Sequence, residues 1–195
     1  MWVSSVLGVA FSVEFLLRAT VEIREVRMGA KFNFFSMLRC IPLVNDLVPL
    51  EVLRTEEPLM VDGFVKAHEK AHLLYHHRMK RNLARISIFL LIIFGLVVAL
   101  NDLRLNAWQA LLVLHFLLAL LRLPYHLITW LQEYDADALA VKELHSAIAQ
   151  RSLEKLAIRE IPHSALFAFL YQEHPTAKMR LRQVSTKKNE IKKAR

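Results

Sequence analysis

Two long apolar stretches constrain this chain more than any other feature of its sequence. Residues 86–101 carry no charge, and a second apolar stretch runs over 107–132. A helix needs about 20 mostly apolar residues to cross a bilayer. The first stretch approaches that length when Leu83-Ala84 are counted and Arg85 extends its charged group to the headgroup layer. Trp108 and Trp130 lie 22 residues apart near the ends of the second. That is roughly 33 Å of helix, which matches a hydrocarbon core of about 30 Å with an aromatic residue at each interface.

The segment 101–106, between these stretches, predicts a tight turn and therefore an antiparallel helical hairpin. Residues 1–17 are apolar or small except for Glu14. Since about 17 residues is the lower limit for a spanning helix, we expect a short membrane helix here. A cleaved signal peptide is the alternative, although no basic segment precedes the apolar run. Glu14 lies four residues from Arg18, and we interpret it as reaching the headgroup layer.

Composition supports a membrane protein. Hydrophobic residues make up 55% of the chain and the mean hydropathy is +0.31, both higher than a soluble domain of this size usually carries. The net charge of +8 is concentrated beside the apolar stretches and in the last twenty residues. This distribution favours anionic lipid headgroups over nucleic acid as partners. Cys40 is the single cysteine, which excludes an intrachain disulfide and a multi-cysteine zinc site.

The segment His68-Glu69-Lys70-Ala71-His72 has the pattern H-E-x-x-H. On a helix this pattern places two imidazoles on one face with a carboxylate beside them, which is a zinc site with its own general base. With a third protein ligand, the remaining coordination position is left to water, and Glu69 would take the proton. A histidine-rich surface helix is the alternative, because His76 and His77 follow closely. The helix is expected to begin near Gly63 and to continue straight into the membrane.

The distances of residues from the turn, measured along the two helices of the hairpin, indicate a third ligand. If the turn is centred at about residue 103.5, His72 and Glu133 lie about 47 and 44 Å from it along two helices. Glu133 is therefore level with the histidine pair, where a His₂Glu zinc site needs its carboxylate. Asp137 shares the face of Glu133, so it can accept the second ring N–H of a zinc-bound histidine. An acidic, solvated helix end is the alternative for this cluster.

The H-E-x-x-H motif, the apolar hairpin, the segment Glu133-Tyr134-Asp135-Ala136-Asp137 and a later His174-Pro175 with Arg180 occur together over roughly residues 60–185. This combination resembles the HtpX and CAAX-prenyl-endopeptidase family of membrane zinc metallopeptidases. Lys70 stands where this family usually has an uncharged residue. A second, weaker resemblance is to the antibiotic-sensing membrane metallopeptidases, in which a lysine at that position is less unusual.

The first resemblance implies endoproteolysis of membrane proteins, with one zinc ion per chain. It implies that His68, His72 and Glu133 are the metal ligands and that Glu69 is the base. It further implies that the segment with His174 and Arg180 closes over the site. There His174 helps to stabilise the oxyanion, and Arg180 holds Asp137.

Basic residues follow the first apolar segment and precede the second, whereas the turn between the second and third offers only Arg104. The positive-inside rule therefore puts the zinc site in the cytoplasm. The predicted protein is an integral multi-pass protein of the cell membrane, mostly all-α, with about three transmembrane helices. The zinc site lies on cytoplasmic extensions of the second and third.

We expect a single domain over 1–195. Its parts are a membrane helix (1–17), a surface segment or roof (18–62), the zinc-binding hairpin (63–137), and cytoplasmic helices with a basic tail (138–195). The predicted activity is hydrolysis of peptide bonds in membrane-associated or misfolded membrane proteins, which are the expected partners together with anionic headgroups. The alternative is a non-catalytic, zinc-binding membrane adaptor or sensor. A fourth protein ligand such as His174 would favour a structural zinc site.

Overall fold

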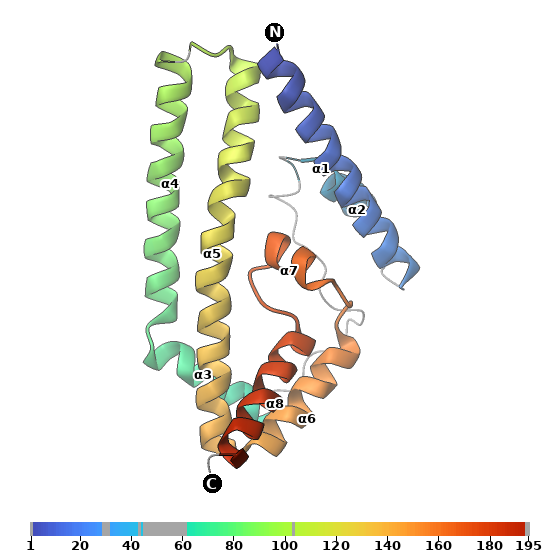
Figure 1. Ribbon diagram of the computed structural model, residues 1–195, viewed down its shortest axis with the longest axis vertical. Coiled ribbons are helices and arrows are strands. Elements are labelled where there is room, and N and C mark those ends of the chain that lie inside the picture. The colour runs from blue at the N-terminus through green and yellow to red at the C-terminus, as the bar shows by residue number, and fades with distance from the viewer. Residues whose placement is uncertain (1, 29–31, 43, 45–61, 103, 194–195) are drawn as a thin grey trace. The chain divides into compact units, whose positions relative to one another are not determined.

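The computed structural model describes residues 2–28, 32–42, 44, 62–102 and 104–193. Every regular element in this part of the chain is a helix, which confirms the all-α expectation (Figure 1). The helices are α1 (Trp2–Arg27), α2 (Phe34–Cys40), α3 (Gly63–Leu74), α4 (His77–Asn101), α5 (Ala107–Leu144), α6 (Ser146–Arg159), α7 (Ala165–Tyr171) and α8 (Ala177–Lys193). Of the surface segment or roof expected over 18–62, residues 45–61 lie outside the described part of the chain.

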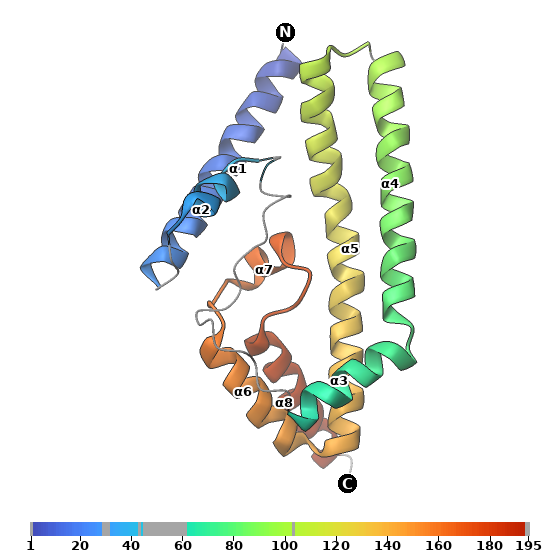
Figure 2. The ribbon, with the colours of Figure 1, turned by 180° about the vertical axis from the view of Figure 1, so that it is seen from behind.

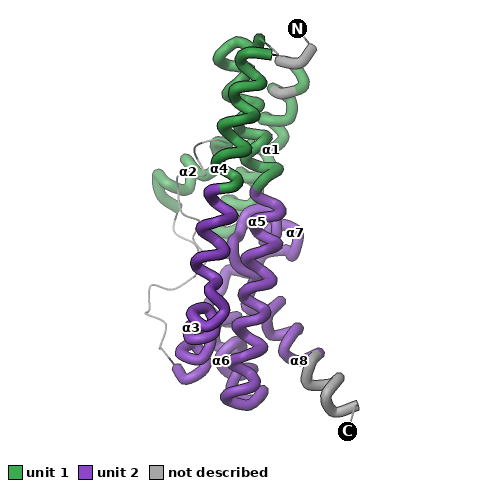
Figure 3. The backbone as a smooth tube through the Cα atoms, turned by 90° about the vertical axis from the view of Figure 1, so that its left-hand side faces the viewer, with its two compact units in different colours: residues 1–54, 87–121 green, residues 55–86, 122–195 purple. Residues whose placement is uncertain are grey.

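The chain divides into two compact units (Figure 3). Unit 1 comprises residues 1–54 and 87–121, and unit 2 comprises residues 55–86 and 122–195. Each of the long helices α4 and α5 therefore contributes one part to each unit. All the residues expected at the zinc site belong to unit 2.

Two helices, α4 and α5, are long and apolar enough to cross a membrane. Only 6% of the most apolar window of α4 is buried, and large side chains such as Phe89 and Phe94 are exposed. The core helix of a soluble protein would instead bury such a window. Helix α1, the third expected span, is not one of the two candidates found among the described residues.

Unit 1 holds the closed end of the hairpin. The Asn106 side chain accepts a hydrogen bond from the Gln109 backbone N–H at 2.9 Å and so caps the start of α5. Gly95 faces α5 closely, because a Cβ placed there would lie 2.7 Å from Leu117 Cδ1. The missing side chain therefore lets the two helices approach each other.

The first helix differs from expectation in its length and in the surroundings of Glu14. Helix α1 continues to Arg27, since the charged residues after 17 continue the helix instead of starting a surface segment. The Glu14 carboxylate accepts hydrogen bonds from Arg18 Nε at 2.8 Å and lies against His115 Nε2 of α5. His115 is only 1% exposed, so Glu14 is held within unit 1 and does not extend alone toward headgroups.

The expectation that the motif helix continues straight into the apolar stretch is wrong. Helix α3 ends at Leu74, and α4 begins at His77 after a turn, with the two helices at an angle (Figure 2). His76 has φ of 53°, in the left-handed region that breaks a helix. The start of α3 is as expected, because the Asp62 side chain accepts a hydrogen bond from Val65 N–H at 3.0 Å.

The core of unit 2 joins α3, the end of α5, α6 and α8. Phe64 and Ala67 of α3 pack with Ala140 of α5, Leu153 of α6 and Val184 of α8. Small residues at 67 and 140 leave room for helices to approach closely. This packing fixes α3 independently of α4, so the motif helix can lie across the end of α5.

Glu160 joins the end of α6 to the start of α8 and generates the first testable prediction. Its carboxylate accepts a hydrogen bond from the Ala177 N–H at 2.7 Å, and burial raises its pKa from 4.5 to about 7. The folded chain therefore binds this proton more tightly than the unfolded chain. The free energy of unfolding should fall as the pH rises from about 4.5 to about 7, by on the order of 1–3 kcal/mol.

Glu160→Gln keeps an oxygen acceptor but removes the titration. The apparent Tm of the purified protein should thus drop less between pH 5 and pH 8 in this variant than in the wild type. Glu154→Gln, an exposed position on the same helix, is the matched control and should behave as wild type. An equal drop in Glu160→Gln and wild type would contradict the assignment.

Candidate metal centre

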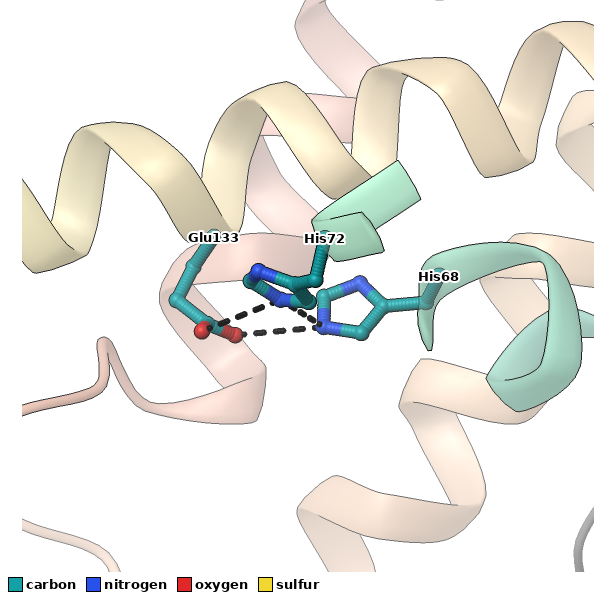
Figure 4. Close-up of side chains that lie close together, drawn as sticks. All are labelled: His68, His72 and Glu133. Carbon is teal, nitrogen blue, oxygen red and sulfur yellow. Dashed lines mark hydrogen bonds and ion pairs between the residues drawn. The ribbon is translucent and has the colours of Figure 1, made fainter. Parts of the chain in front are cut away.

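Three side chains expected to bind metal meet in unit 2 (Figure 4). His68 and His72 lie one turn apart on α3, and Glu133 comes from α5. The two histidine Nε2 atoms are 3.0 Å apart. Glu133 Oε2 lies 3.3 Å from His68 Nε2, and Glu133 Oε1 lies 3.4 Å from His72 Nε2. One potential ligand atom from each residue therefore points to a shared centre.

The spacing of these atoms fits a tetrahedral metal ion. Ligands at about 2.0–2.1 Å from a tetrahedral zinc are separated from one another by about 3.3 Å. The two histidine nitrogens are 3.0 Å apart, and each lies within 3.4 Å of one of the two Glu133 oxygens, which is close to that value. Two imidazoles and one carboxylate are also a donor set that zinc prefers. With one ligand atom from each residue within 4.8 Å of the others, the residues present fit such an ion.

The other ring nitrogens of the two histidines have partners that fix their orientation. His68 Nδ1 lies 2.9 Å from Asp137 Oδ1, and His72 Nδ1 lies 2.8 Å from His77 Nδ1. Burial, and then the neighbouring His72, lower the pKa of His77 to about 4, so its neutral ring can accept the His72 N–H. Because each Nδ1 can donate to its own partner, each Nε2 would be free to offer its lone pair to a metal in place of its hydrogen bond to Glu133.

Arg180 contacts Asp137 beside His68. Its Nε and Nη2 atoms donate to the two oxygens of Asp137 at 2.8 and 2.6 Å, a bidentate pair. Burial alone would raise the pKa of Asp137, but the hydrogen bonds from Arg180 and His68 outweigh it and lower that pKa. Asp137 is therefore a carboxylate at neutral pH, able to accept the His68 N–H. This is the contact that the resemblance implied for Arg180.

Glu133, one of the three candidate ligands, is buried at 3% exposure and has several polar contacts. Arg81 Nη2 donates to its Oε1 at 2.8 Å, and His174 Nδ1 lies 3.0 Å from the same oxygen. Burial would raise the pKa of Glu133, but hydrogen bonds from His174, His68 and His72 hold it well below its ordinary value. The carboxylate is consequently ionised and ready to coordinate a cation.

The centre opens into a cleft of about 1140 Å³ formed by unit 2. Glu69 lines this cleft beside the histidines, is exposed, and makes no hydrogen bond to any described residue. His174 also lines it and is 57% exposed. Lys70 instead pairs with Glu143 at 2.8 Å and is not among the lining residues. The unusual lysine in the motif therefore does not block the site.

Two residues at this centre, His77 and Arg81, were not identified from the sequence as part of it. His77 was seen only as one of several histidines after the motif, and Arg81 only as a basic residue before the membrane. Arg81 also donates through Nε to Gln132 Oε1 at 2.7 Å, which aims its guanidinium at the next residue, Glu133. The sequence places His77 and Arg81 one to three helical turns beyond His72. This spacing indicates a role at the centre only when the break of the helix at 75–76 is known.

The chain thus has the helical H-E-x-x-H site and glutamate donor of a gluzincin-type metallopeptidase. The model of Peptidase family M48 matches residues 50–188, so the chain belongs to this family of metal-dependent, typically zinc, peptidases. The resemblance drawn from the motifs is confirmed at this level. Neither a curated protein nor a solved structure matches the chain.

Arg81 is expected to tune the metal site through Glu133. Arg81→Ala frees Glu133 Oε1 from its strongest orienting contact, and loss of such a partner typically lowers metal affinity by about 10–100-fold. Zinc affinity, measured by competition with a chelating dye, should fall in this range.

The matched control is Arg85→Ala, one turn further along α4, where the guanidinium is 56% exposed and contacts Glu173. This variant should bind zinc as the wild type does. If the two alanine variants bound zinc equally well, Arg81 would have no role in holding the ligand.

Proposed function

We propose that this protein is a zinc-dependent endopeptidase that hydrolyses peptide bonds of membrane-associated or misfolded membrane proteins. The observation that carries the proposal is that three potential metal-ligand atoms lie at one open cleft with the carboxylate of Glu69, which pairs with no described residue. A structural metal site would need neither a free base nor an entrance. Membership of Peptidase family M48 supports the same chemistry.

His68, His72 and Glu133 would hold the ion. When bound, zinc supplies a Lewis acid that polarises the scissile carbonyl and lowers the pKa of a coordinated water. Glu69 follows His68 directly on the exposed side of α3, where it can take the proton of the attacking water and deliver it to the leaving amine. Because Glu69 has no partner among the described residues, its carboxylate can turn toward the reacting groups without breaking another contact.

His174 is suited to a supporting role at the cleft. Its Nδ1 contacts Glu133, and much of the ring remains accessible to a substrate. We propose that its other nitrogen donates to the carbonyl oxygen as negative charge develops there. Among the described residues, the group with all its ligand atoms within 4.8 Å comprises His68, His72 and Glu133. This three-donor set favours the enzyme over a structural or sensing site with His174 as fourth ligand.

We further propose that the protein is a single domain of the cell membrane with three membrane spans. Its active site would face the cytoplasm. Apolar segments 86–101 and 107–132 would form two of them. The acid in the apolar part of α1, Glu14, is paired with Arg18 and His115, which reduces the cost of placing it in lipid and supports α1 as the third. The basic segments would contact anionic headgroups.

The catalytic proposal makes a specific prediction for two variants. Glu69→Gln should retain one zinc per chain but lose cleavage of an unfolded membrane substrate by at least about 100-fold, since the base is removed while the ligands stay. Glu133→Ala should lose both zinc and cleavage. Elemental analysis and cleavage are measured on the same detergent-purified samples. Retained cleavage by Glu69→Gln would contradict the mechanism, and retained zinc in Glu133→Ala would contradict the ligand set.

The proposed orientation can be tested with single cysteines in a Cys40→Ser background. Asn106→Cys in the turn between α4 and α5 should react with a membrane-impermeant maleimide added to intact cells. Lys142→Cys, at the exposed end of α5, should react only after the membrane is permeabilised. The reverse pattern would place the active site outside the cell, and labelling of both in intact cells would contradict a spanning hairpin.

A further inference from the structure

The cleft at the metal centre carries more basic than acidic side chains. Among the described residues, three acids line it, Asp62, Glu69 and Glu133. Six basic residues do so: Arg78, Arg81, Arg85, Lys155, Arg159 and Arg180. Two of the acids are already engaged, because Asp62 caps α3 and Glu133 belongs to the metal centre. The surface offered to a substrate is therefore positively charged, and a bound dication would add to that charge.

Four of the six basic residues divide by their partners. Arg81 and Arg180 are neutralised within the metal centre by Glu133 and Asp137. Arg78 at the start of α4 and Lys155 on α6 are exposed and make no ion pair with any described residue. These two cations, on separate helices, are available to a ligand.

Arg85 belongs with the available group. It contacts Glu173 at 3.3 Å, but both side chains are about half exposed, at 56% and 44%. A solvent-exposed pair of this kind holds its members weakly. A substrate carboxylate can thus compete for Arg85 at little cost.

Apolar side chains lie beside these cations in the same cleft. Leu73 of α3 and Ile158 of α6 are 75% and 76% exposed although both line the cleft. Leu156 adds to this apolar lining. Exposed apolar groups next to unpaired cations suit a ligand with both hydrophobic and anionic parts.

We infer that the cleft selects peptide segments in which acidic side chains stand beside apolar ones, within a few residues of the scissile bond. This inference rests on the proposed peptidase function and names its substrate class. The cleft volume of about 1140 Å³ exceeds the roughly 300–1,000 Å³ of most small-ligand sites, which favours a length of chain over a single anionic headgroup. Arg78 and Lys155 bind the substrate carboxylates, and the apolar lining receives their neighbours.

The test uses two fluorogenic peptides that differ only in Asp against Asn at two positions flanking an apolar pair. Wild-type enzyme should prefer the Asp peptide in kcat/KM by on the order of tenfold at low salt. The preference should shrink at about 0.5 M salt, because exposed charges are then screened. Lys155→Glu and Arg78→Glu should each abolish or reverse it. Lys142→Glu, the same charge change at an exposed position outside the cleft lining, should keep it.

A binding measurement separates this inference from the proposed function. Fluorescence anisotropy with the Glu69→Gln variant reports affinity for each peptide without cleavage, while zinc content and Tm verify that the charge variants are folded. Preferential binding of the Asp peptide without cleavage of either peptide by wild type would refute the peptidase and leave the specificity intact. Equal binding and equal cleavage of the two peptides would overturn the proposed specificity and leave the peptidase function intact.

A lipid headgroup is the competing occupant. Soluble short-chain phosphatidylglycerol should displace the Asp peptide only weakly from the wild-type cleft. If it instead bound more tightly than the peptide, and lost that affinity in Lys155→Glu, the cations would belong to a lipid site and the inference would be wrong.

Discussion

The buried carboxylate of Glu133 is the interaction on which the rest of unit 2 depends. A negative charge at 3% exposure is costly unless surrounding groups compensate it. His68 and His72 of α3, Arg81 of α4 and His174 before α8 all contact it. One side chain of α5 thus gathers three other parts of the chain around itself. The same arrangement that satisfies the charge leaves its oxygens and two imidazole nitrogens converging on the space a cation would fill.

The break between α3 and α4 allows this convergence. If the motif helix continued in line with α4, His68, His77 and Arg81 would lie on one straight helix. Instead the left-handed backbone at His76 starts a new helix direction. Side chains of α4 then contact His72 and Glu133, and α3 packs on α6 and α8. A turn of two residues therefore separates the metal-binding helix from the apolar helix and lets each satisfy its own surroundings.

Counting residues along the hairpin placed Glu133 beside His72 correctly, although the count did not include the break between α3 and α4. It treated residues 72–101 as one helix, yet Glu133 still lies beside His72. The break at 75–76 lies close to His72, and from His77 to Asn101 and from Ala107 past Glu133 the chain forms the continuous helices that the estimate assumed. Glu133 was therefore found from spacing, whereas His77 and Arg81 were missed, because their directions depend on a backbone break that periodicity does not reveal. The length of α1 was missed similarly, since charged residues are good helix formers beyond the apolar run.

The sequence by itself determined the helical class, the two apolar stretches of α4 and α5, and the residues His68, His72 and Glu133, because these follow from local periodicity and from short spacings of chemically distinctive side chains. Tertiary structure alone decided which nitrogen of each histidine faces the centre, how Arg81 and His77 join it, that Lys70 turns to Glu143, and that Arg78 and Lys155, which pair with no described acid, line the cleft with Glu69. These features arise where helices distant in sequence meet, and the direction of a side chain there is fixed by packing and charge compensation instead of by local pattern.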